Sequence, residues 1–416
     1  MSFQNLHLES KILKAIHEKN FQTPTEVQEK VIPLVLEKKD LIVLSQTGSG
    51  KSASFVVPVL QEWSKNRGPA KKGKVKVLVL TPTRELTLQV ANAFSEFGKY
   101  LPKTPQVVSI IGGTKIGDQL FDIQQGCDIL VATSGRFLDV LSKKQLNLSH
   151  IECFILDEAD KMLDLGFEEE LEEILEAIPD ERQNLMFSAT YPPKMQSIAA
   201  KITQDALEIK IEQEEQIVSK INQRVIQVDR EKRGPILRHL LEENKWCLVL
   251  VFMANKRATD NIAEKFRKHG IKAASFNADL EQAVRNDTLT AFKEGKVNVL
   301  FATDIAARGL DIDDIDCVVN YDLPRSPADY IHRIGRTARA GKSGDAISFI
   351  DFETQDHFKL IEKRSGIKLE RESIQGFELT GVAPQKMKGP APVKGKKKSK
   401  KDKLREQKAL QEQGEI

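Results

Sequence analysis

Short apolar runs alternate along the chain with longer stretches in which apolar positions recur every three or four residues. Leu41–Leu44, Val75–Leu80 and Leu248–Phe252 are runs of the first kind, and Phe167–Ile178 and Asn255–His269 show the helical spacing. Continuous apolar runs between amphipathic helices are typical of strands that are buried on both faces of a parallel sheet. The pattern therefore predicts an α/β fold with parallel sheets.

The strand-like runs fall into two groups, which predicts two domains. Between the groups lies the polar stretch IEQEEQIVSKINQ. We therefore expect a first domain over residues 1–210, a linker over 211–223, a second domain over 224–370 and a tail over 371–416, in a chain long enough for two cores. The other expected strands are Val107–Ile111, Ile129–Val131, Cys153–Leu156, Asn184–Phe187, Lys272–Phe276, Val297–Phe301, Cys317–Asn320 and Ala346–Ile350.

The C-terminal tail differs from the rest of the chain in composition. From Lys386 to Ile416 there are eleven Lys and Arg against four Asp and Glu, a net charge of +7, which leaves −4 for the rest because the whole chain carries +3. Proline, glycine and lysine dominate, so a disordered segment is expected. Such a tail either attracts nucleic-acid phosphate or only raises solubility.

The sequence also limits where the protein works. The N-terminal stretch MSFQNLHLESK has no apolar signal region, and no apolar run is long enough to cross a bilayer. The four cysteines lie far apart and show no metal-ligand spacing. We expect a cytoplasmic protein with free thiols and no membrane partner.

The stretch SQTGSGKS follows the apolar run that ends at Leu44. Gly48 and Gly50 allow a tight loop whose N–H groups point at phosphate oxygens, and the next helix adds the positive end of its dipole. Lys51 can reach the β- and γ-phosphates, and the Ser52 hydroxyl can bind Mg²⁺. Glycine-rich loops are most often simple turns, and a serine stands where a P-loop usually begins with glycine. The preceding strand and the Gly-Lys-Ser ending nevertheless favour nucleotide binding.

A second stretch, ECFILDEADKML, runs from a buried strand directly into acids. If a nucleotide binds with Mg²⁺, Asp157 would hold the ion, because Mg²⁺ takes one or two carboxylates and keeps several waters. Glu158 would orient and deprotonate the water that attacks the γ-phosphate. The simpler alternative is an acidic cap at a helix N-terminus.

The second half of the chain has no P-loop but contains HRIGRTARAG, in which Arg333, Arg336 and Arg339 recur every three residues. They could form a solvated basic face. Alternatively, Arg336 and Arg339 act as arginine fingers at a nucleotide held by the first domain, which would raise the rate about a thousandfold or more.

Taken together, these stretches resemble the DEAD-box family of ATP-dependent RNA helicases over residues 3–350. The family implies two tandem RecA-like P-loop domains, ATP and Mg²⁺ as cofactors, and RNA as partner. The short lead-in and basic tail resemble bacterial members, the RhlE-like branch among them. The stretches that carry the resemblance are NFQTPTEVQ, SQTGSGKS, PTRELT, GG, TSGR, DEAD, SAT, DLEQAVR, ATDIAARGLDI and HRIGRTARAG.

The resemblance implies a role for individual residues. The catalytic residues would be Lys51, Asp157, Glu158, Arg336 and Arg339, with Ser52 and Asp157 at the metal. The nucleotide would contact Phe21, Gln28, Ser45, Gln46, Thr47, Gly48, Ser49, Gly50, Lys51, Ser52 and, at the ribose, Asp311. RNA would contact Pro82, Thr83, Arg84, Gly113, Thr133, Arg136, Arg285 and Thr303. Ser188, Thr190, Asp160 and His332 would couple the two domains.

The chain departs from the family pattern at several of these positions. Ser45 and Ser52 stand for the usual Ala and Thr, and Ser52 keeps the hydroxyl that a metal needs. Ser134 and Ala338 stand for Pro and Gly, so one RNA-facing loop loses the fixed φ of proline. Asn277 is followed by alanine where His-Gly is common. None of these changes removes a charge from the ATP site.

The function that follows is an ATP-dependent RNA helicase that clamps RNA and unwinds short duplexes locally and non-processively. Its contacts would go mainly to phosphates and 2′-hydroxyls, with little sequence specificity. A monomer is expected, with single-stranded and short duplex RNA as partners and with ribosomal RNA or RNA-decay complexes as further candidates. The alternatives are an ATP-dependent RNA clamp or ribonucleoprotein assembly scaffold with little unwinding, and a duplex-DNA translocase, against which Gln28 and the RNA motif set argue.

Overall fold

The computed structural model describes residues 2–45, 48–65, 74–211, 221–307, 312, 315–338 and 343–380. The residues up to Thr380 form one unit by their mutual contacts. Four candidate residues, Gln46, Thr47, Asp311 and Arg339, lie outside the described residues, as does the chain from 381 onward.

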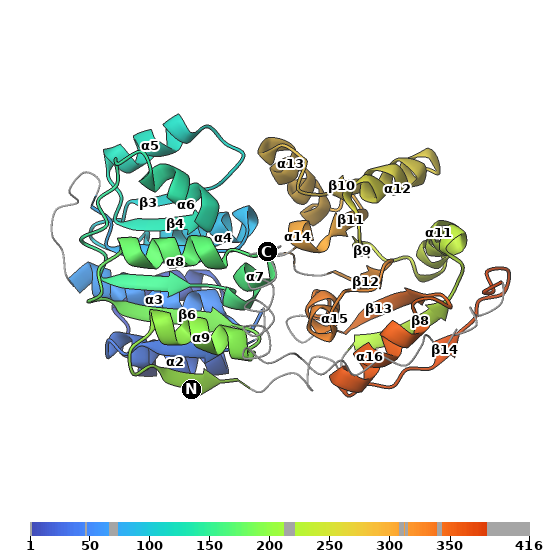
Figure 1. The fold of residues 1–416 in the computed structure, drawn as a ribbon, viewed down its shortest axis with the longest axis horizontal. Coiled ribbons are helices and arrows are strands. Elements are labelled where there is room, and N and C mark those ends of the chain that lie inside the picture. The colour runs from blue at the N-terminus through green and yellow to red at the C-terminus, as the bar shows by residue number, and fades with distance from the viewer. Residues whose placement is uncertain are drawn as a thin grey trace, which may run out of the picture. The chain divides into compact units, whose positions relative to one another are not determined.

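The first lobe is built on a parallel sheet of seven strands in the order β3-β4-β2-β5-β6-β1-β7 (Figure 1). Its strands are β1 (Leu41–Leu44), β2 (Val77–Thr81), β3 (Val107–Ile110), β4 (Ile129–Thr133), β5 (Cys153–Leu156), β6 (Gln183–Ser188) and β7 (Leu207–Lys210). Its helices are η1 (Phe3–Leu6), α1 (Ser10–Glu18), α2 (Glu26–Leu36), α3 (Lys51–Lys65), α4 (Arg84–Gly98), α5 (Ile116–Gln125), α6 (Ser134–Leu141), α7 (Ala159–Asp164), α8 (Glu168–Ala177) and α9 (Pro193–Ile202).

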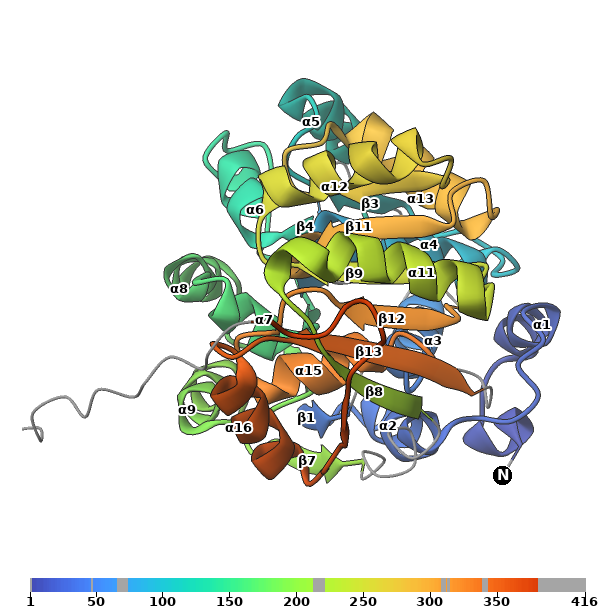
Figure 2. The same cartoon turned by 90° about the vertical axis from the view of Figure 1, so that its right-hand side faces the viewer.

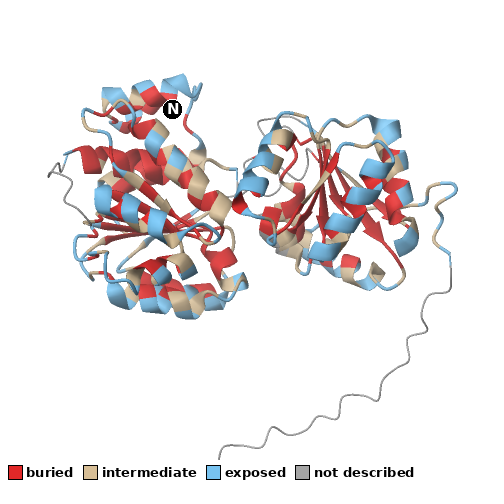
Figure 3. Cartoon of the chain, turned by 90° about the horizontal axis from the view of Figure 1, so that it is seen from above, coloured by how far each residue is buried: buried red, intermediate tan, exposed pale blue. Residues whose placement is uncertain are grey.

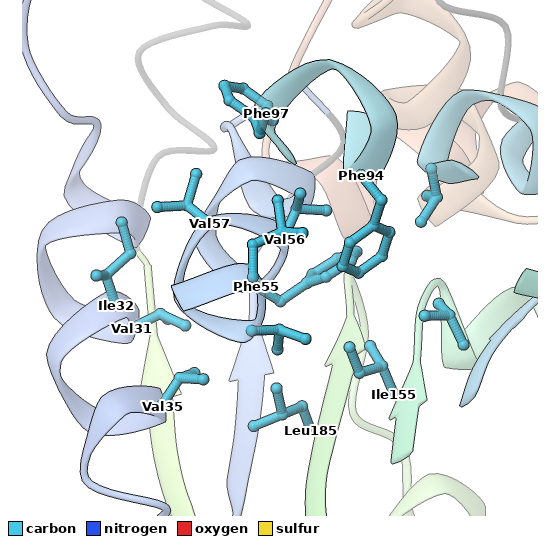
Figure 4. Close-up of a cluster of buried hydrophobic side chains, with 14 of the residues drawn as sticks. Val31, Ile32, Val35, Phe55, Val56, Val57, Phe94, Phe97, Ile155 and Leu185 are labelled. Atoms are coloured by element: carbon cyan, nitrogen blue, oxygen red, sulfur yellow. The ribbon is translucent and has the colours of Figure 1, made fainter. Parts of the chain in front are cut away.

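Each face of this sheet has its own core because successive strand residues point to opposite faces. Leu41 and Val43 pack in one cluster with η1 and helices α1 to α4, and Ile42 packs in the other with helices α5 to α9. In the first cluster, Phe55 of α3 lies between the sheet and Phe94 of α4 (Figure 4). The long apolar runs seen in the sequence are therefore strands covered on both sides.

The second lobe repeats this plan with strands in the order β10-β11-β9-β12-β13-β8-β14. They are β8 (Ile221–Gln227), β9 (Val249–Met253), β10 (Ala273–Phe276), β11 (Val299–Thr303), β12 (Cys317–Asn320), β13 (Gly344–Ile350) and β14 (Arg371–Glu372). The helices are η2 (Arg230–Lys232), α11 (Arg233–Asn244), α12 (Lys256–Lys268), α13 (Gln282–Lys293), α14 (Asp304–Ala307), α15 (Pro327–Ile334) and α16 (Gln355–Ser365). Figure 2 shows α11 and α12 lying over one face of this sheet.

The two sheets have the same strand order: each strand of the second sheet has a number seven higher than the strand at the same place in the first, so that β10 corresponds to β3 and β14 to β7. All strand pairs of both sheets are parallel, and the strands are buried between helices whose outward faces are exposed (Figure 3). The predicted fold of two tandem parallel-sheet domains is confirmed.

Some boundaries differ from those expected. β8 begins at Ile221, inside the expected linker, whose residues 212–220 lie outside the described part. The expected tail began at residue 371, but Arg371–Glu372 forms β14 and pairs with β8. No apolar run marks β14. It is held by ion pairs of 2.6 Å from Arg371 to Glu362 and 2.7 Å from Arg224 to Glu372.

Three of the cysteines are buried free thiols, whereas Cys247 is exposed because it precedes β9 at the end of the sheet. Within the described ranges no helix combines the length and the apolar character that crossing a membrane requires.

Candidate active site

The candidate residues gather where the strands of the first sheet end. Carboxyl ends of parallel strands meet at one edge, and ligands of open α/β sheets bind there. The order β5-β6-β1 places the ends of these three strands side by side, so the DEAD stretch, the SAT stretch and the P-loop are neighbours. The order β3-β4-β2 gathers GG, TSGR and PTRELT at the other half of the same edge.

The P-loop is held by its own hydrogen bonds. Gly48 and Gly50 have φ of 86° and 94°, which favours glycine at both positions. Lys51 is buried, and its Nζ donates to the carbonyl of Ser45 over 2.7 Å. The Ser45 and Ser49 hydroxyls lie 2.6 Å apart, and the amide of Ser45 donates to the carbonyl of Ser188 over 2.9 Å. The start of the P-loop is thereby bonded to the SAT stretch.

Of the two predicted adenine-binding residues, Gln28 lies beside this loop. The Gln28 side chain accepts from the amide of Thr25 over 3.0 Å and donates through Nε2 to the carbonyl of Gly50 over 3.2 Å. A Cβ at Gly50 would lie 2.6 Å from Gln28 Nε2, so only glycine allows this approach. Phe21 is 41% exposed, and its ring centroid is 6.1 Å from that of Phe97. An exposed aromatic ring of this kind can stack on a base.

The two adjacent acids after β5 are both buried. Burial raises the pKa of Asp157 to about 7, although the charge of Lys51 opposes the shift. A buried carboxylate in this state gains from a bound cation. Asp157 and the hydroxyl of Ser52 therefore fit Mg²⁺, which needs few protein ligands. Among the described residues there is no cluster of three or more His, Cys, Asp and Glu suited to a metal.

Glu158 has left-handed backbone angles, φ 50° and ψ 49°, which are uncommon for a residue with a side chain. It occupies the N-cap position of α7, yet its side chain makes no capping hydrogen bond. The helix-cap alternative for Glu158 is therefore not supported. Local strain of this kind clusters at functional sites.

The third acid of the stretch ties two motifs together. Asp160 Oδ2 accepts from the amide of Thr190 over 3.2 Å and from its hydroxyl over 3.0 Å. The Ser188 hydroxyl donates to the carbonyl of Thr190 over 2.7 Å. A movement of the DEAD stretch would therefore be transmitted to the SAT stretch.

His332 lies in α15 of the second lobe and faces the DEAD stretch. Burial, together with the charge of Lys161, lowers the pKa of His332 to about 3, so the imidazole is neutral at pH 7. Its Nδ1 is buried and has no hydrogen-bond partner among the described atoms. Asp329, which lies in α15 together with His332, forms an ion pair of 3.3 Å with Lys161 of α7. This ion pair joins the two lobes, and the sequence did not predict it.

Residues of both lobes line one cavity of about 20 Å³. Glu158 of the first lobe and Arg336 of the second are both part of its lining. Arg333 also reaches the cavity, but its guanidinium is bound within its own lobe, to Asp304 at 2.6 Å and Asn320 at 2.9 Å. Arg336 is 7% exposed, so the alternative of a solvated basic face is wrong for Arg333 and Arg336.

The RNA-facing candidates of the first lobe surround Arg84 at the start of α4. Thr83 caps this helix, accepting from the amide of Leu86 over 3.3 Å, and Pro82 before it is buried. Gly113 has a φ of 83°, and a Cβ there would overlap the Arg84 guanidinium. Burial, and then the charge of Arg285, lower the pKa of Arg84, with a smaller effect from Arg136. Three arginines crowded in this way favour an anionic ligand.

The remaining RNA-facing candidates fall in the expected places. Thr133 ends β4 beside Thr81 of β2, and the Arg136 guanidinium donates to the carbonyl of Thr114 over 3.1 Å. In the second lobe, Thr303 ends β11 and is buried. The roles of all these side chains remain predictions.

Arg285 of α13, another RNA-facing candidate, is held by contacts on several sides. Its Nε donates to Glu85 Oε1 over 2.7 Å, its Nη1 donates to the carbonyl of Asn277 over 2.6 Å, and it lies 4.3 Å from the ring centroid of Phe276. Glu85 was not among the predicted residues, although it stands next to Arg84 in PTRELT. Asp329 was missed too, although its place three residues before His332 puts both on one helix face.

The fold and this edge define a class: tandem RecA-like domains, the first of which carries a P-loop. Residues 25–198 match the DEAD/DEAH box helicase family and residues 232–341 the helicase conserved C-terminal domain. The chain is 39% identical over 370 residues to the DEAD-box ATP-dependent RNA helicase CshA of Geobacillus kaustophilus, covering 89% of this chain and 78% of the relative.

CshA of Bacillus subtilis is 38% identical over 371 residues, 89% of this chain and 74% of the relative. The structure of S. cerevisiae Dbp5 bound to RNA and ADP BeF3 matches with a TM-score of 0.78 and 30% identity, covering 89% of this chain and 95% of that one. The chain therefore belongs to the DEAD-box ATP-dependent RNA helicases. The resemblance to the RhlE-like branch stays a prediction.

Proposed function

We propose that this helicase is a two-lobed clamp that couples ATP hydrolysis to local, non-processive unwinding of short RNA duplexes. The observation that carries the proposal is the cavity that Glu158 and Arg336 line from different lobes. A site divided in this way can be complete only when both lobes take part, so hydrolysis would depend on how the lobes meet.

The residues of the first lobe would bind ATP and prepare its hydrolysis. In this proposal Lys51 leaves the Ser45 carbonyl for the β- and γ-phosphates, and the P-loop amides cradle them. Mg²⁺, held by Asp157 and Ser52, would neutralise phosphate charge when bound. Glu158 would take the proton of the attacking water, and Arg336 would stabilise the charge of the transition state.

RNA would bind at the other half of the edge. Arg84 and Arg136 of one lobe and Arg285 of the other would contact phosphates, which carry no sequence information, so binding would be largely sequence-independent. Because ATP and RNA would each contact both lobes, each would strengthen the binding of the other by linkage. Asp160, which accepts a hydrogen bond from Thr190 of the SAT stretch, would transmit this coupling.

The cellular setting belongs to the same proposal. We propose a cytoplasmic monomer that acts on structured RNA such as ribosomal RNA or the substrates of RNA-decay complexes. Buried free thiols are consistent with a reducing compartment. The proposed roles of Gln46, Thr47, Asp311 and Arg339 rest on the sequence alone.

A strand-displacement assay with parallel ATPase measurement tests the proposal. We expect short RNA duplexes to be separated with ATP, RNA to stimulate ATPase, and DNA duplexes of equal length to remain intact. Lys51→Ala serves as the control without ATP turnover. RNA-stimulated ATPase without strand separation would instead indicate a clamp or assembly scaffold, and separation of DNA would indicate a translocase.

A further inference from the structure

Asn277 lies in the loop between β10 and α13, directly after Phe276. It is 1% exposed and uses both ends of its amide. Its Oδ1 accepts from the amide of Asp279 over 3.0 Å, which closes a turn over its own chain. Its Nδ2 donates to Thr259 Oγ1 over 3.2 Å and to Asp260 Oδ1 over 3.1 Å. The loop is thereby attached to α12.

This attachment fixes the direction of the backbone carbonyl of Asn277. A peptide group is planar, and the side-chain bonds restrain the chain on both sides of it. The carbonyl accepts from Nη1 of Arg285 over 2.6 Å, and the ring of Phe276 lies beneath the same guanidinium. The acceptor and the ring, from adjacent residues, therefore set the place of Arg285.

We propose that Asn277 is a positioning residue that holds Arg285 in the orientation in which it contacts an RNA phosphate. The inference rests on the proposed RNA-binding role of Arg285. An arginine has five N–H donors, and the contacts with Glu85 and the Asn277 carbonyl occupy three of them. Two donors remain for a phosphate oxygen, and their direction depends on those contacts.

The chemistry of the site explains why asparagine suits this position. The loop needs one acceptor, for the amide of Asp279, and two N–H donors, for Thr259 and Asp260. Aspartate would keep the acceptor but place a second carboxylate beside Asp260. Alanine would leave the buried Thr259 hydroxyl without one hydrogen-bond donor, and the Asp260 carboxylate and the Asp279 amide would lose a partly buried bond, and such losses are costly.

The test is a double-mutant cycle with Asn277→Ala, Arg285→Ala and the double variant. The readout is the concentration of single-stranded RNA that gives half-maximal ATPase stimulation, together with the rate at saturating RNA. We expect Asn277→Ala to raise the half-saturating concentration about three- to tenfold, with a smaller change in the saturated rate. In the Arg285→Ala background the same substitution should add almost nothing, because the group that it positions is absent.

Two further variants control for folding. Asn298→Ala removes an asparagine whose Nδ2 donates to the Cys247 carbonyl over 2.8 Å, at the opposite end of the same sheet, and should leave the half-saturating RNA concentration unchanged. Thr259→Val removes one hydrogen-bond partner of Asn277. It should raise the half-saturating RNA concentration about twofold, in the same direction as Asn277→Ala. This variant also replaces Asn277→Ala in the cycle if the alanine variant does not fold.

The outcomes separate this inference from the proposed function. If Arg285→Ala leaves the RNA requirement unchanged, the proposed RNA role of Arg285 is wrong. Another outcome is that Arg285→Ala raises the half-saturating RNA concentration while Asn277→Ala and Thr259→Val leave it unchanged. In that case, or if the effects of Asn277→Ala and Arg285→Ala simply add in the double variant, Asn277 is a structural residue and the positioning inference fails.

Discussion

The two lobes share one strand order but carry different side chains at the same edge. After β1 the first lobe has the P-loop, whereas after β8 the second lobe has no Gly-Lys-Ser sequence and continues into η2 and α11. Two residues past β5 stands Glu158, and two residues past β12, at the equivalent place, stands Asp322. Asp322 forms an ion pair with Arg233 of its own lobe at 3.0 Å, whereas no ion pair is found for Glu158 among the described residues.

This difference indicates that two lobes with the same fold would have different roles in the proposed reaction. The sheet supplies the edge, and the loops decide what the edge can do. In the first lobe Asp157 is buried and its pKa is raised, and this is the edge where we propose that the nucleotide and Mg²⁺ bind. In the second lobe the equivalent acid is neutralised internally, and the lobe contributes Arg336 instead. Variants on either side should therefore fail in different ways.

The largest effect is expected for Arg336→Ala in the second lobe. Removal of an arginine finger should lower RNA-stimulated ATP turnover about a thousandfold, because the charge of the transition state loses its partner. ATP binding, measured with a fluorescent nucleotide, should be nearly unchanged because the P-loop lies in the other lobe. Turnover close to normal would show that Arg336 only lines the cavity.

Glu158→Gln tests the first lobe. Glutamine keeps the shape but cannot accept the proton of the attacking water, so turnover should fall about a hundredfold or more. ATP and RNA should still bind, and the complex should persist because hydrolysis no longer releases it. RNA retention on a filter with ATP should increase. If retention does not increase, Glu158 is not the base.

A smaller effect is expected at the RNA half of the edge. Gly113→Ala places a methyl group against the Arg84 guanidinium and should raise the half-saturating RNA concentration about fivefold while the KM for ATP stays unchanged. Gly166→Ala is the matched control. It has a similar φ, 81°, and therefore a similar backbone strain of about 1 kcal/mol, but no atom lies within 4 Å of its added Cβ. If the half-saturating RNA concentration is the same in the two variants, Arg84 does not take part in RNA binding.

The stretches that carry the candidate site of the first lobe could be recognised from the sequence because each has a local pattern, and the roles of their residues remain predictions. SQTGSGKS and DEAD each follow a continuous apolar strand, and parallel strands bring their ends together. The amphipathic helices were located to within a residue, as α8 and α12 show. β7, β8 and β14 were missed because β7 and β14 are short edge strands with exposed or charged residues and β8 alternates too weakly.

The remaining features depend on residues that are distant in sequence. The ion pairs of Lys161 with Asp329 and of Glu85 with Arg285 join residues 168 and 200 positions apart, which no local pattern reveals. Asn277 was noticed only as a departure from a family pattern, and its contacts with α12 became visible in the structure. The two ion pairs follow from how the lobes meet, and the contacts of Asn277 follow from how its loop packs on α12. A single sequence leaves both open.

The smallest effect is expected for the tail, which differs from both lobes in composition. Deletion of Lys386–Ile416 removes a net charge of +7, and binding to phosphate releases counterions, so RNA affinity should fall more at 50 mM than at 200 mM salt. The measurement is the slope of log affinity against log salt concentration. A tail of equal length with Gln in place of Lys and Arg is the control, and it should behave like the deletion. A slope equal to that of the intact chain would mean that the two lobes carry all electrostatic contacts with RNA and that the tail only aids solubility.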